Sequence, residues 1–321
     1  MKTTKYIISL LTFLVTFTLN AQCWFTNLTT DLANASNEFK TFIKNNDDAF
    51  MAYKTIYNAR GANAAFRLDV SLLEKIAILR NDANFIQKIG GEAELEKIIQ
   101  ANVRARCKSC GNAGADYLKH IDEYLDDVHH FATNYHGVDG FRDVLTDIKR
   151  INSTGSPNLN VEGSAFMLRV LNEKQSTFLG KITKFEGSID DAVNGCKYDI
   201  TFNNGIKVTF GEFKSYKVES LSNFLKSGGD TYQQFTTYIG KVNSIDELHY
   251  YFDINKISDI SVIKNRFKKV FQDNADDIFN KMKPEFKNTL FGRNQLSNQK
   301  QIFNAMIQDT NSILYSFIKN V

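Results

Sequence analysis

The stretch Lys197–Tyr216 constrains the fold more than any other part of this chain. It reads KYDITFNNGIKVTFGEFKSY, two short runs in which apolar and polar side chains alternate. Alternation with a period of two indicates β-strands, and Asn204-Gly205 between the runs favours a two-residue hairpin turn. We therefore expect two central strands, Lys197–Phe202 and Ile206–Tyr216.

The turn suggests a register for these strands. If Asn203 pairs with Ile206, then Asp199 opposes Phe210. Asp199 and Glu212 then become diagonal neighbours on one face of the sheet, roughly 7 Å apart. The two carboxylates would be close enough to share one metal ion after side-chain adjustment.

The apolar side chains of the two strands conflict with that register, because it places them on opposite faces. A three-residue loop would unite them on one face but would send Asp199 away from Glu212. Two arrangements remove the conflict: helices cover both faces of the sheet, or a bulge resets the register near the carboxylates. We favour the covered sheet. The apolar residues are Ile200, Phe202, Ile206, Val208 and Phe210.

Three side chains of this stretch form the residue set of a metal-dependent site for phosphodiester cleavage. Asp199 and Glu212 are suitable ligands for Mg²⁺ or Mn²⁺, since hard cations prefer carboxylate oxygens. Lys214 lies two residues after Glu212, so both project from the same side of the strand. Its ammonium group would orient the attacking water or offset charge on the phosphate. The alternative is a structural charge cluster, because Glu-x-Lys is common at solvated strand edges.

The pattern of the chain changes near residue 150. Residues 22–150 carry helical stripes of apolar side chains, and we expect an all-α domain there. Residues 151–160 include Pro157 and are predicted to be a linker. Residues 161–321 are predicted to form an α/β domain with a mixed sheet flanked by helices, so that the whole chain is α+β. Beyond the central strands, this domain's expected elements are a helix at Glu162–Glu173, a strand pair in Phe178–Ile189, a broken helix at Val218–Tyr238, a strand at Leu248–Ile254, a long helix at Asp259–Met282 and a helix at Lys300–Ile318.

The first residues predict export. Lys2 and Lys5 precede an apolar run that ends near Leu19, and the small residue Ala21 follows. This is the layout of a signal peptide, here residues 1–21, and the alternative is an uncleaved anchor. We expect a secreted or periplasmic protein with no stable membrane insertion after cleavage. The formal net charge of +3 is compatible with a phosphate-bearing partner without requiring one.

The cysteines leave two interpretations open. Cys107 and Cys110 are spaced as in a small-loop disulfide or as one half of a metal knuckle. A zinc site would need two further ligands, and no second close pair at finger spacing follows. A zinc-dependent protein is therefore a third functional hypothesis, behind the two below.

The central stretch resembles the PD-(D/E)XK, or restriction-endonuclease-like, nuclease family. The matching motifs are Tyr198-Asp199-Ile200 and Gly211-Glu212-Phe213-Lys214, placed after a helix and before another. The resemblance implies a catalytic set of Asp199, Glu212 and Lys214, with a glutamate on the first helix. Glu162 is our choice for that glutamate, and Glu173 is the alternative. The family pattern has proline before the aspartate, where this chain has Tyr198.

Some members of that family carry Gln-x-x-x-Tyr on the next helix, and Gln234 and Tyr238 fit this pattern. The resemblance implies that these two side chains position the substrate backbone. Lys264 and Lys268 belong, with Arg266 and Lys269, to a basic group that would contact phosphates, unless it is only a solvated helix face.

The whole arrangement also resembles the C-terminal regions of bacterial polymorphic toxins. That resemblance implies a nucleic-acid substrate, delivery to a competitor cell and a cognate immunity protein. The leading hypothesis is thus an exported metal-dependent nuclease. The alternative is a secreted helical binding or adhesion protein whose nuclease-like domain is inactive.

Overall fold

The chain divides into two compact units, residues 1–133 with 148–161, and residues 134–147 with 162–321. The computed structural model describes residues 26, 28–60, 69–106, 114–150, 159–188, 197–203, 205 and 207–321. The predicted signal peptide, residues 151–158 of the predicted linker, and all four cysteines lie outside the described residues. The cysteines are Cys23, Cys107, Cys110 and Cys196.

The first unit is helical throughout its described part, as predicted. The expected apolar stripes are buried; Leu72, Leu73 and Ile76, for example, have no exposed surface. The Asp69 side chain caps α5 by accepting a hydrogen bond from the Leu72 N–H at 2.7 Å. Among the described residues, no helix is both long and apolar enough to cross a membrane. The helices are α2 (Asn37–Asn45), α3 (Ala49–Arg60), α5 (Val70–Asn81), α6 (Ala83–Ile89), α7 (Glu92–Arg106) and α8 (Gly114–Tyr135), the last of which ends in the second unit.

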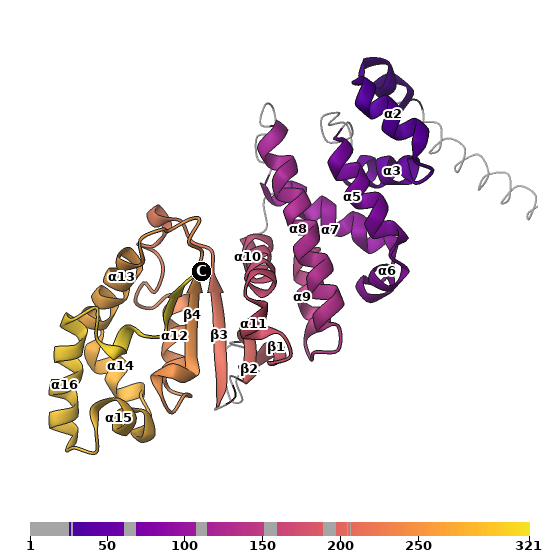
Figure 1. Ribbon diagram of the computed structural model, residues 1–321. Coiled ribbons are helices and arrows are strands. Elements are labelled where there is room, and N and C mark those ends of the chain that lie inside the picture. The colour runs from indigo at the N-terminus through magenta and orange to yellow at the C-terminus, as the bar shows by residue number, and fades with distance from the viewer. Residues whose placement is uncertain are drawn as a thin grey trace, which may run out of the picture. The chain divides into compact units, whose positions relative to one another are not determined.

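The second unit is built on a five-stranded mixed sheet in the order β1-β2-β3-β4-β5 (Figure 1). The pairs β1–β2 and β2–β3 are antiparallel, whereas β3–β4 and β4–β5 are parallel. The strands are β1 (Ile182–Ser188), β2 (Lys197–Asn203), β3 (Val208–Lys214), β4 (Leu248–Phe252) and β5 (Ile318–Asn320). The α-helices are α9 (Phe141–Ile148), α10 (Leu159–Glu173), α11 (Gln175–Phe178), α12 (Asp230–Ile239), α13 (Ile260–Asp273), α14 (Ala275–Lys281), α15 (Pro284–Phe291) and α16 (Leu296–Gln308).

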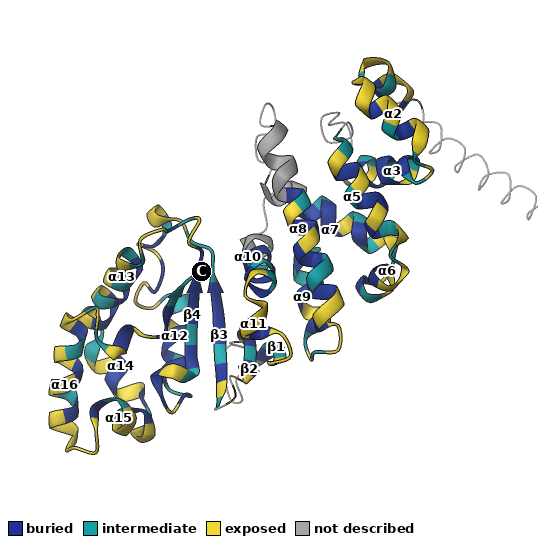
Figure 2. Ribbon diagram, viewed as in Figure 1, coloured by how far each residue is buried: buried dark blue, intermediate teal, exposed yellow. Residues whose placement is uncertain are grey.

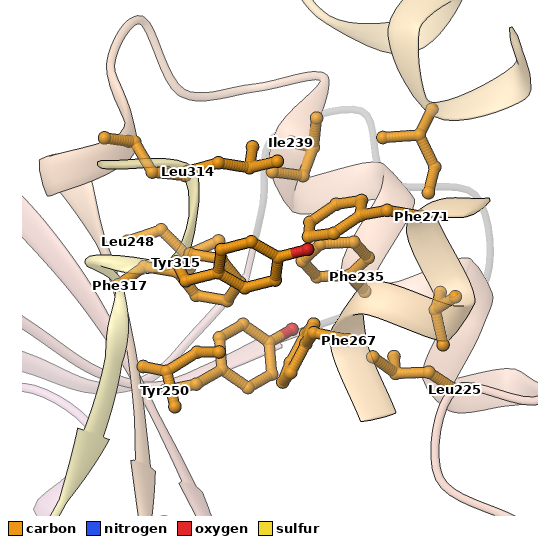
Figure 3. Close-up of a cluster of buried hydrophobic side chains, with 14 of the residues drawn as sticks. Leu225, Phe235, Ile239, Leu248, Tyr250, Phe267, Phe271, Leu314, Tyr315 and Phe317 are labelled. Atoms are coloured by element: carbon orange, nitrogen blue, oxygen red, sulfur yellow. The ribbon is translucent and has the colours of Figure 1, made fainter. Parts of the chain in front are cut away.

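Helices cover both faces of this sheet, so β3 and β4 are buried along most of their length (Figure 2). On one face, Phe178 of α11 packs edge-on against Phe202 of β2 and Tyr251 of β4. On the other face, α12 and α13 pack on β4 through a cluster of aromatic rings that includes Tyr250 and Phe267 (Figure 3). Burial on both sides explains why the two central strands carry apolar residues on both faces.

The predicted hairpin register is wrong. Asn203 pairs with Val208 instead of Ile206, so the connection spans four residues instead of two. Adding two residues moves the pairing along the strand but leaves every side chain on its original face. The expected conflict is therefore resolved by helices on both faces, as we favoured.

Several predicted elements differ from the observed ones. The long helix expected at Asp259–Met282 is two helices, because the Asn274 side chain donates to the Val270 carbonyl at 3.0 Å and ends α13. The helix expected to Ile318 ends at Gln308 and is followed by β5, which adds a fifth strand. The region Phe178–Ile189 holds one described strand, β1, instead of a pair, and only the part of Val218–Tyr238 from Asp230 onward is α-helical.

The approach of the segment before α9 to β1 gives a test of this packing. Gly140 has a φ of 79°, and a Cβ there would lie 2.1 Å from the Phe185 carbonyl oxygen. We expect Gly140→Ala to lower the free energy of unfolding by roughly 3 kcal/mol or more, since a backbone atom cannot move aside. Chemical denaturation measures this change.

Gly180 provides the matched control for this substitution. Its φ of 73° is nearly the same, but nothing lies within 4 Å of a Cβ at that position. Gly180→Ala should therefore lower the free energy of unfolding by only about 1 kcal/mol, from the left-handed backbone. Equal losses in both variants would contradict the close packing at Gly140.

Candidate active site

Strand β3 presents Glu212 and Lys214 on the face that α12 covers. The Lys214 Nζ donates a hydrogen bond to Glu212 Oε2 at 2.5 Å. Phe213 between them points to the opposite face, where its ring stacks on Tyr251. The Glu212 side chain is completely buried, and the Lys214 side chain is 14% exposed. The sequence prediction that these two residues project together is confirmed.

Asp199 lies where the pairing of β2 with β3 ends. The last paired residues are Ile200 and Gly211, so a continued register would place Asp199 directly opposite Glu212. The Asp199 Oδ2 accepts the Phe213 N–H at 2.6 Å, and so occupies the position of a strand carbonyl. Asp199 is half-buried, and in the part of the chain that the structure describes, no hydrogen bond to its Oδ1 is present.

Helix α12 holds Glu212 from above the sheet. The Tyr238 hydroxyl lies 2.7 Å from Glu212 Oε1 and 2.6 Å from the Lys197 carbonyl oxygen. Gln234, one turn earlier on the helix, donates to the Tyr238 oxygen at 2.5 Å. Tyr238 has no exposed surface. The predicted pair therefore meets Glu212, but Tyr238 is placed to position the carboxylate and not to touch a substrate.

Burial dominates the electrostatics of these groups. It raises the pKa of Glu212 to about 7, and the nearby Asp199 charge adds to the shift while Lys214 opposes it. Burial also raises the pKa of Asp199, against the attraction of Lys214. For Lys214, burial alone would lower the pKa, but the carboxylates of Glu212 and Asp199 outweigh it and hold the pKa above its ordinary value. Lys214 is thus protonated at neutral pH and faces two carboxylates.

The sequence prediction missed one nearby carboxyl group, that of Glu186 on β1. The pairs Phe185–Ile200 and Gly187–Tyr198 flank it, so it lies opposite Asp199 on β2. Its backbone φ is 48°, which is unusual for any residue other than glycine. Burial raises the pKa of Glu186 to about 7, and the charge of Asp199 adds to this. Its spacing in β1 carried no signal that could have distinguished it from a surface glutamate.

The remaining predicted residues lie on other helices, α10 and α13. Glu162 belongs to α10, but its side chain lies outside the described residues. Lys268 on α13 donates to the Gln308 carbonyl at 2.8 Å and so connects α13 with α16. Lys264 is one turn before Lys268 on the same helix. In the described part of the chain, neither lysine contacts Asp199 or Glu212.

The donor set fits a hard divalent cation in its chemistry. Two carboxylates face a single ammonium group, so a divalent cation would compensate the remaining negative charge. Within the described ranges, no group of three or more His, Cys, Asp and Glu side chains is arranged to hold a metal ion. The candidate ligands are the pair Asp199 and Glu212, and Mg²⁺ is often held by one or two protein carboxylates.

Comparison with known proteins does not place this chain in a family. It matches no protein-family model, no curated protein and no solved structure.

The raised pKa of Glu212 predicts how stability depends on pH in the absence of metal. Between pH 4.5 and about 7, the folded state holds a proton on Glu212 that the unfolded chain has released. Stability from this group is complete below pH 4.5 and falls as the pH rises to about 7. Glu212→Gln removes this dependence, so its stability relative to wild type should rise by on the order of 3 kcal/mol across the window.

Denaturation at a series of pH values in chelator measures the difference between the two proteins. Glu219→Gln, at an exposed position, controls for the loss of a carboxyl group. A constant difference between Glu212→Gln and wild type from pH 4.5 to 7.5 would contradict the assignment.

Proposed function

We propose that this protein is a metal-dependent nuclease with a restriction-endonuclease-like catalytic unit. The observation that carries the proposal is the meeting of Asp199, Glu212 and Lys214 at the ends of two paired strands, beneath Tyr238. The order of the elements supports this fold assignment. Helix α10 precedes three antiparallel strands, and α12 and the parallel strand β4 follow them. The nuclease family that the sequence resembles has the same order.

The chain's own groups have separable roles in phosphodiester hydrolysis. Protonated Lys214 would stabilise negative charge that develops on the phosphate oxygens, and its raised pKa argues against a role as a base. Glu212 has a pKa of about 7 without a metal, so a bound cation would displace a proton from this carboxyl group near neutral pH. Mg²⁺ or Mn²⁺ held by Asp199 and Glu212 would supply Lewis-acid stabilisation and a more acidic bound water.

Tyr238 and Gln234 act behind the reacting groups in this proposal. Tyr238 fixes the orientation of Glu212, and Gln234 fixes the Tyr238 hydroxyl. Removal of such a supporting group typically lowers metal affinity or activity by roughly 10- to 100-fold. Glu162 would add a carboxylate from α10, in line with the family resemblance.

The setting of the nuclease is part of the same proposal. The predicted signal peptide at residues 1–21 would export the protein, and the toxin resemblance favours an effector that acts on DNA or RNA in a competitor cell. A cognate immunity protein would then protect the producing cell. The helical unit would serve delivery or packing.

One observation favours a second candidate function, a secreted binding or adhesion protein with an inactive nuclease-like unit. Both oxygens of Glu212 are already hydrogen-bonded within the protein, to Tyr238 and Lys214, and the side chain is completely buried. A closed cluster of this kind can be purely structural. Calorimetric titration with Mg²⁺ and Mn²⁺ separates the candidates, because only the nuclease requires binding that Glu212→Gln removes.

Cleavage assays test the leading proposal directly. The protein is incubated with plasmid DNA and with total RNA, in Mg²⁺ or in chelator. We expect cleavage only with the metal, abolished by Glu212→Gln and reduced by roughly 10²- to 10³-fold in Lys214→Gln, through loss of charge stabilisation. Glu219→Gln should retain wild-type activity. Undiminished cleavage by both of the first two variants would overturn the site assignment.

Replacing Tyr238 tests the supporting role of α12. Tyr238→Phe removes one hydroxyl group and should raise the Mg²⁺ concentration for half-maximal activity by about 10- to 100-fold. Tyr232→Phe is the matched control, since Tyr232 is on the same helix and donates to Asp277 at 2.6 Å instead. An unchanged metal requirement in Tyr238→Phe, or an equal rise in both variants, would argue against positioning of Glu212 by Tyr238.

A further inference from the structure

A basic pocket of about 350 Å³ lies between α13 and the segment that joins β3 to α12. Its lining includes the cationic residues Lys226, Arg266 and Lys269 and one acidic residue, Asp273. Lys269 pairs with Asp273 at 3.1 Å, which leaves Lys226 and Arg266 with no ion-pair partner in the part of the chain described. The pocket therefore carries an excess of positive charge.

Arg266 is held in a fixed orientation at this pocket. Its Nε donates to the Phe224 carbonyl at 2.7 Å, so the two terminal nitrogens of the guanidinium group remain for a ligand. A planar guanidinium group binds phosphate oxygens in pairs, which makes a held arginine well suited to phosphate.

The wall of the pocket opposite α13 is also held in place. Phe224 and Leu225 are buried, and the Leu225 N–H is bound by Thr231 Oγ1 at 3.0 Å. Ser227 donates to the Asn274 side chain at 3.1 Å and closes one side. The segment between β3 and α12 thus forms a prepared surface and needs little ordering when a ligand binds.

The segment that lines this pocket also contacts the strands of the candidate active site. Phe224 packs against Phe252, which is the register partner of Lys214 on the neighbouring strand. Phe224 also packs against Tyr216, two residues after Lys214. The Phe224 ring therefore connects the segment that lines the pocket with the strand ends that carry the catalytic groups.

The two basic flanks of α13 differ in what they face. Successive residues turn by about 100° around a helix, so Arg266 and Lys269 lie on one side of the buried stripe, and Lys264 and Lys268 on the other. Lys268 binds Gln308, at the end of the helix that leads to β5. Strand β5 is at the far edge of the sheet from β1, whereas Arg266 and Lys269 face the segment that follows β3.

We infer that this pocket binds a phosphate group of the nucleic-acid strand next to the bond that is cut, through Arg266, Lys226 and Lys269. The inference rests on the proposed nuclease function. It keeps Arg266 and Lys269 of the predicted basic group, adds Lys226, and no longer treats Lys264 and Lys268 as the main phosphate contacts. Hydroxyl and amide groups of Ser222 and Asn223 at the pocket would contribute neutral hydrogen bonds.

Binding measurements test this inference separately from catalysis. The full chain carries Glu212→Gln, and anisotropy of a fluorescent oligonucleotide is followed in chelator at several KCl concentrations. Lys226→Gln with Lys269→Gln should weaken binding by about tenfold at low salt. The salt dependence should also fall by about one to two phosphate contacts, because each neutralised phosphate releases counterions.

The control removes two positive charges elsewhere, through Lys174→Gln with Arg293→Gln, both at exposed positions. Thermal melting of every variant checks folding. In the background that retains Glu212, the pocket variant should raise KM and leave kcat within about twofold, as expected for lost ground-state binding.

The possible outcomes distinguish a failure of the pocket inference from a failure of the nuclease proposal. If the protein cleaves nucleic acid and the pocket variant binds like the control variant, the pocket inference fails and the nuclease proposal stands. If no version of the protein binds or cleaves nucleic acid, the nuclease proposal fails and the inference fails with it. Weakened binding that competes with a free nucleoside monophosphate, but with no change in salt dependence, would also overturn it in favour of a mononucleotide site.

Discussion

The second unit depends on how a charged pair is kept inside a sheet. Glu212 is completely buried, and a carboxylate without partners in such a place costs several kcal/mol, roughly estimated. Lys214 supplies the opposite charge and Tyr238 supplies a hydrogen bond, each from a different element. The buried pair of Glu212 and Lys214 is stable because β3, β4 and α12 surround it. Conversely, loss of one partner would leave a buried charge, which explains why this site and the packing around it are inseparable.

The arrangement of the sheet serves that requirement. Its antiparallel half brings Asp199 beside the end of β3, and its parallel half places Tyr250 next to Glu212. Aromatic rings fill both faces, from Phe178 on one side to Phe267 on the other. Large rings exclude water from the Glu212 carboxylate and so strengthen its electrostatic interactions. The same exclusion of water is what shifts the pKa of Glu212 toward neutral pH.

Local patterns in the sequence predicted the presence of helices and strands better than the residues at which they begin and end. Residues Ile263 to Met282 keep one apolar stripe across the break at Asn274, so periodicity alone could not reveal that α13 stops there. Strand β5 has three residues, too few to show alternation. Glu212 and Lys214 were found because a spacing of two fixes their shared face. Glu186 and the Lys197 carbonyl were not found in this way. The role of Glu186 arises from the pairing of β1 with β2, and that of the Lys197 carbonyl from its contact with α12, and no local pattern encodes either.

The Tyr238 hydroxyl has one hydrogen and two acceptors, the Glu212 carboxylate and the Lys197 carbonyl. When Glu212 is ionised, it competes more strongly for that hydrogen, and the first residue of β2 loses part of its tether to α12. When Glu212 is protonated, it can donate to Tyr238, which then donates fully to Lys197. The charge on Glu212 of β3 thereby changes the strength of a hydrogen bond to the Lys197 carbonyl of β2, two residues before Asp199. Fraying of that strand end, as amide hydrogen exchange would record it, is thus tied to the protonation of its neighbour.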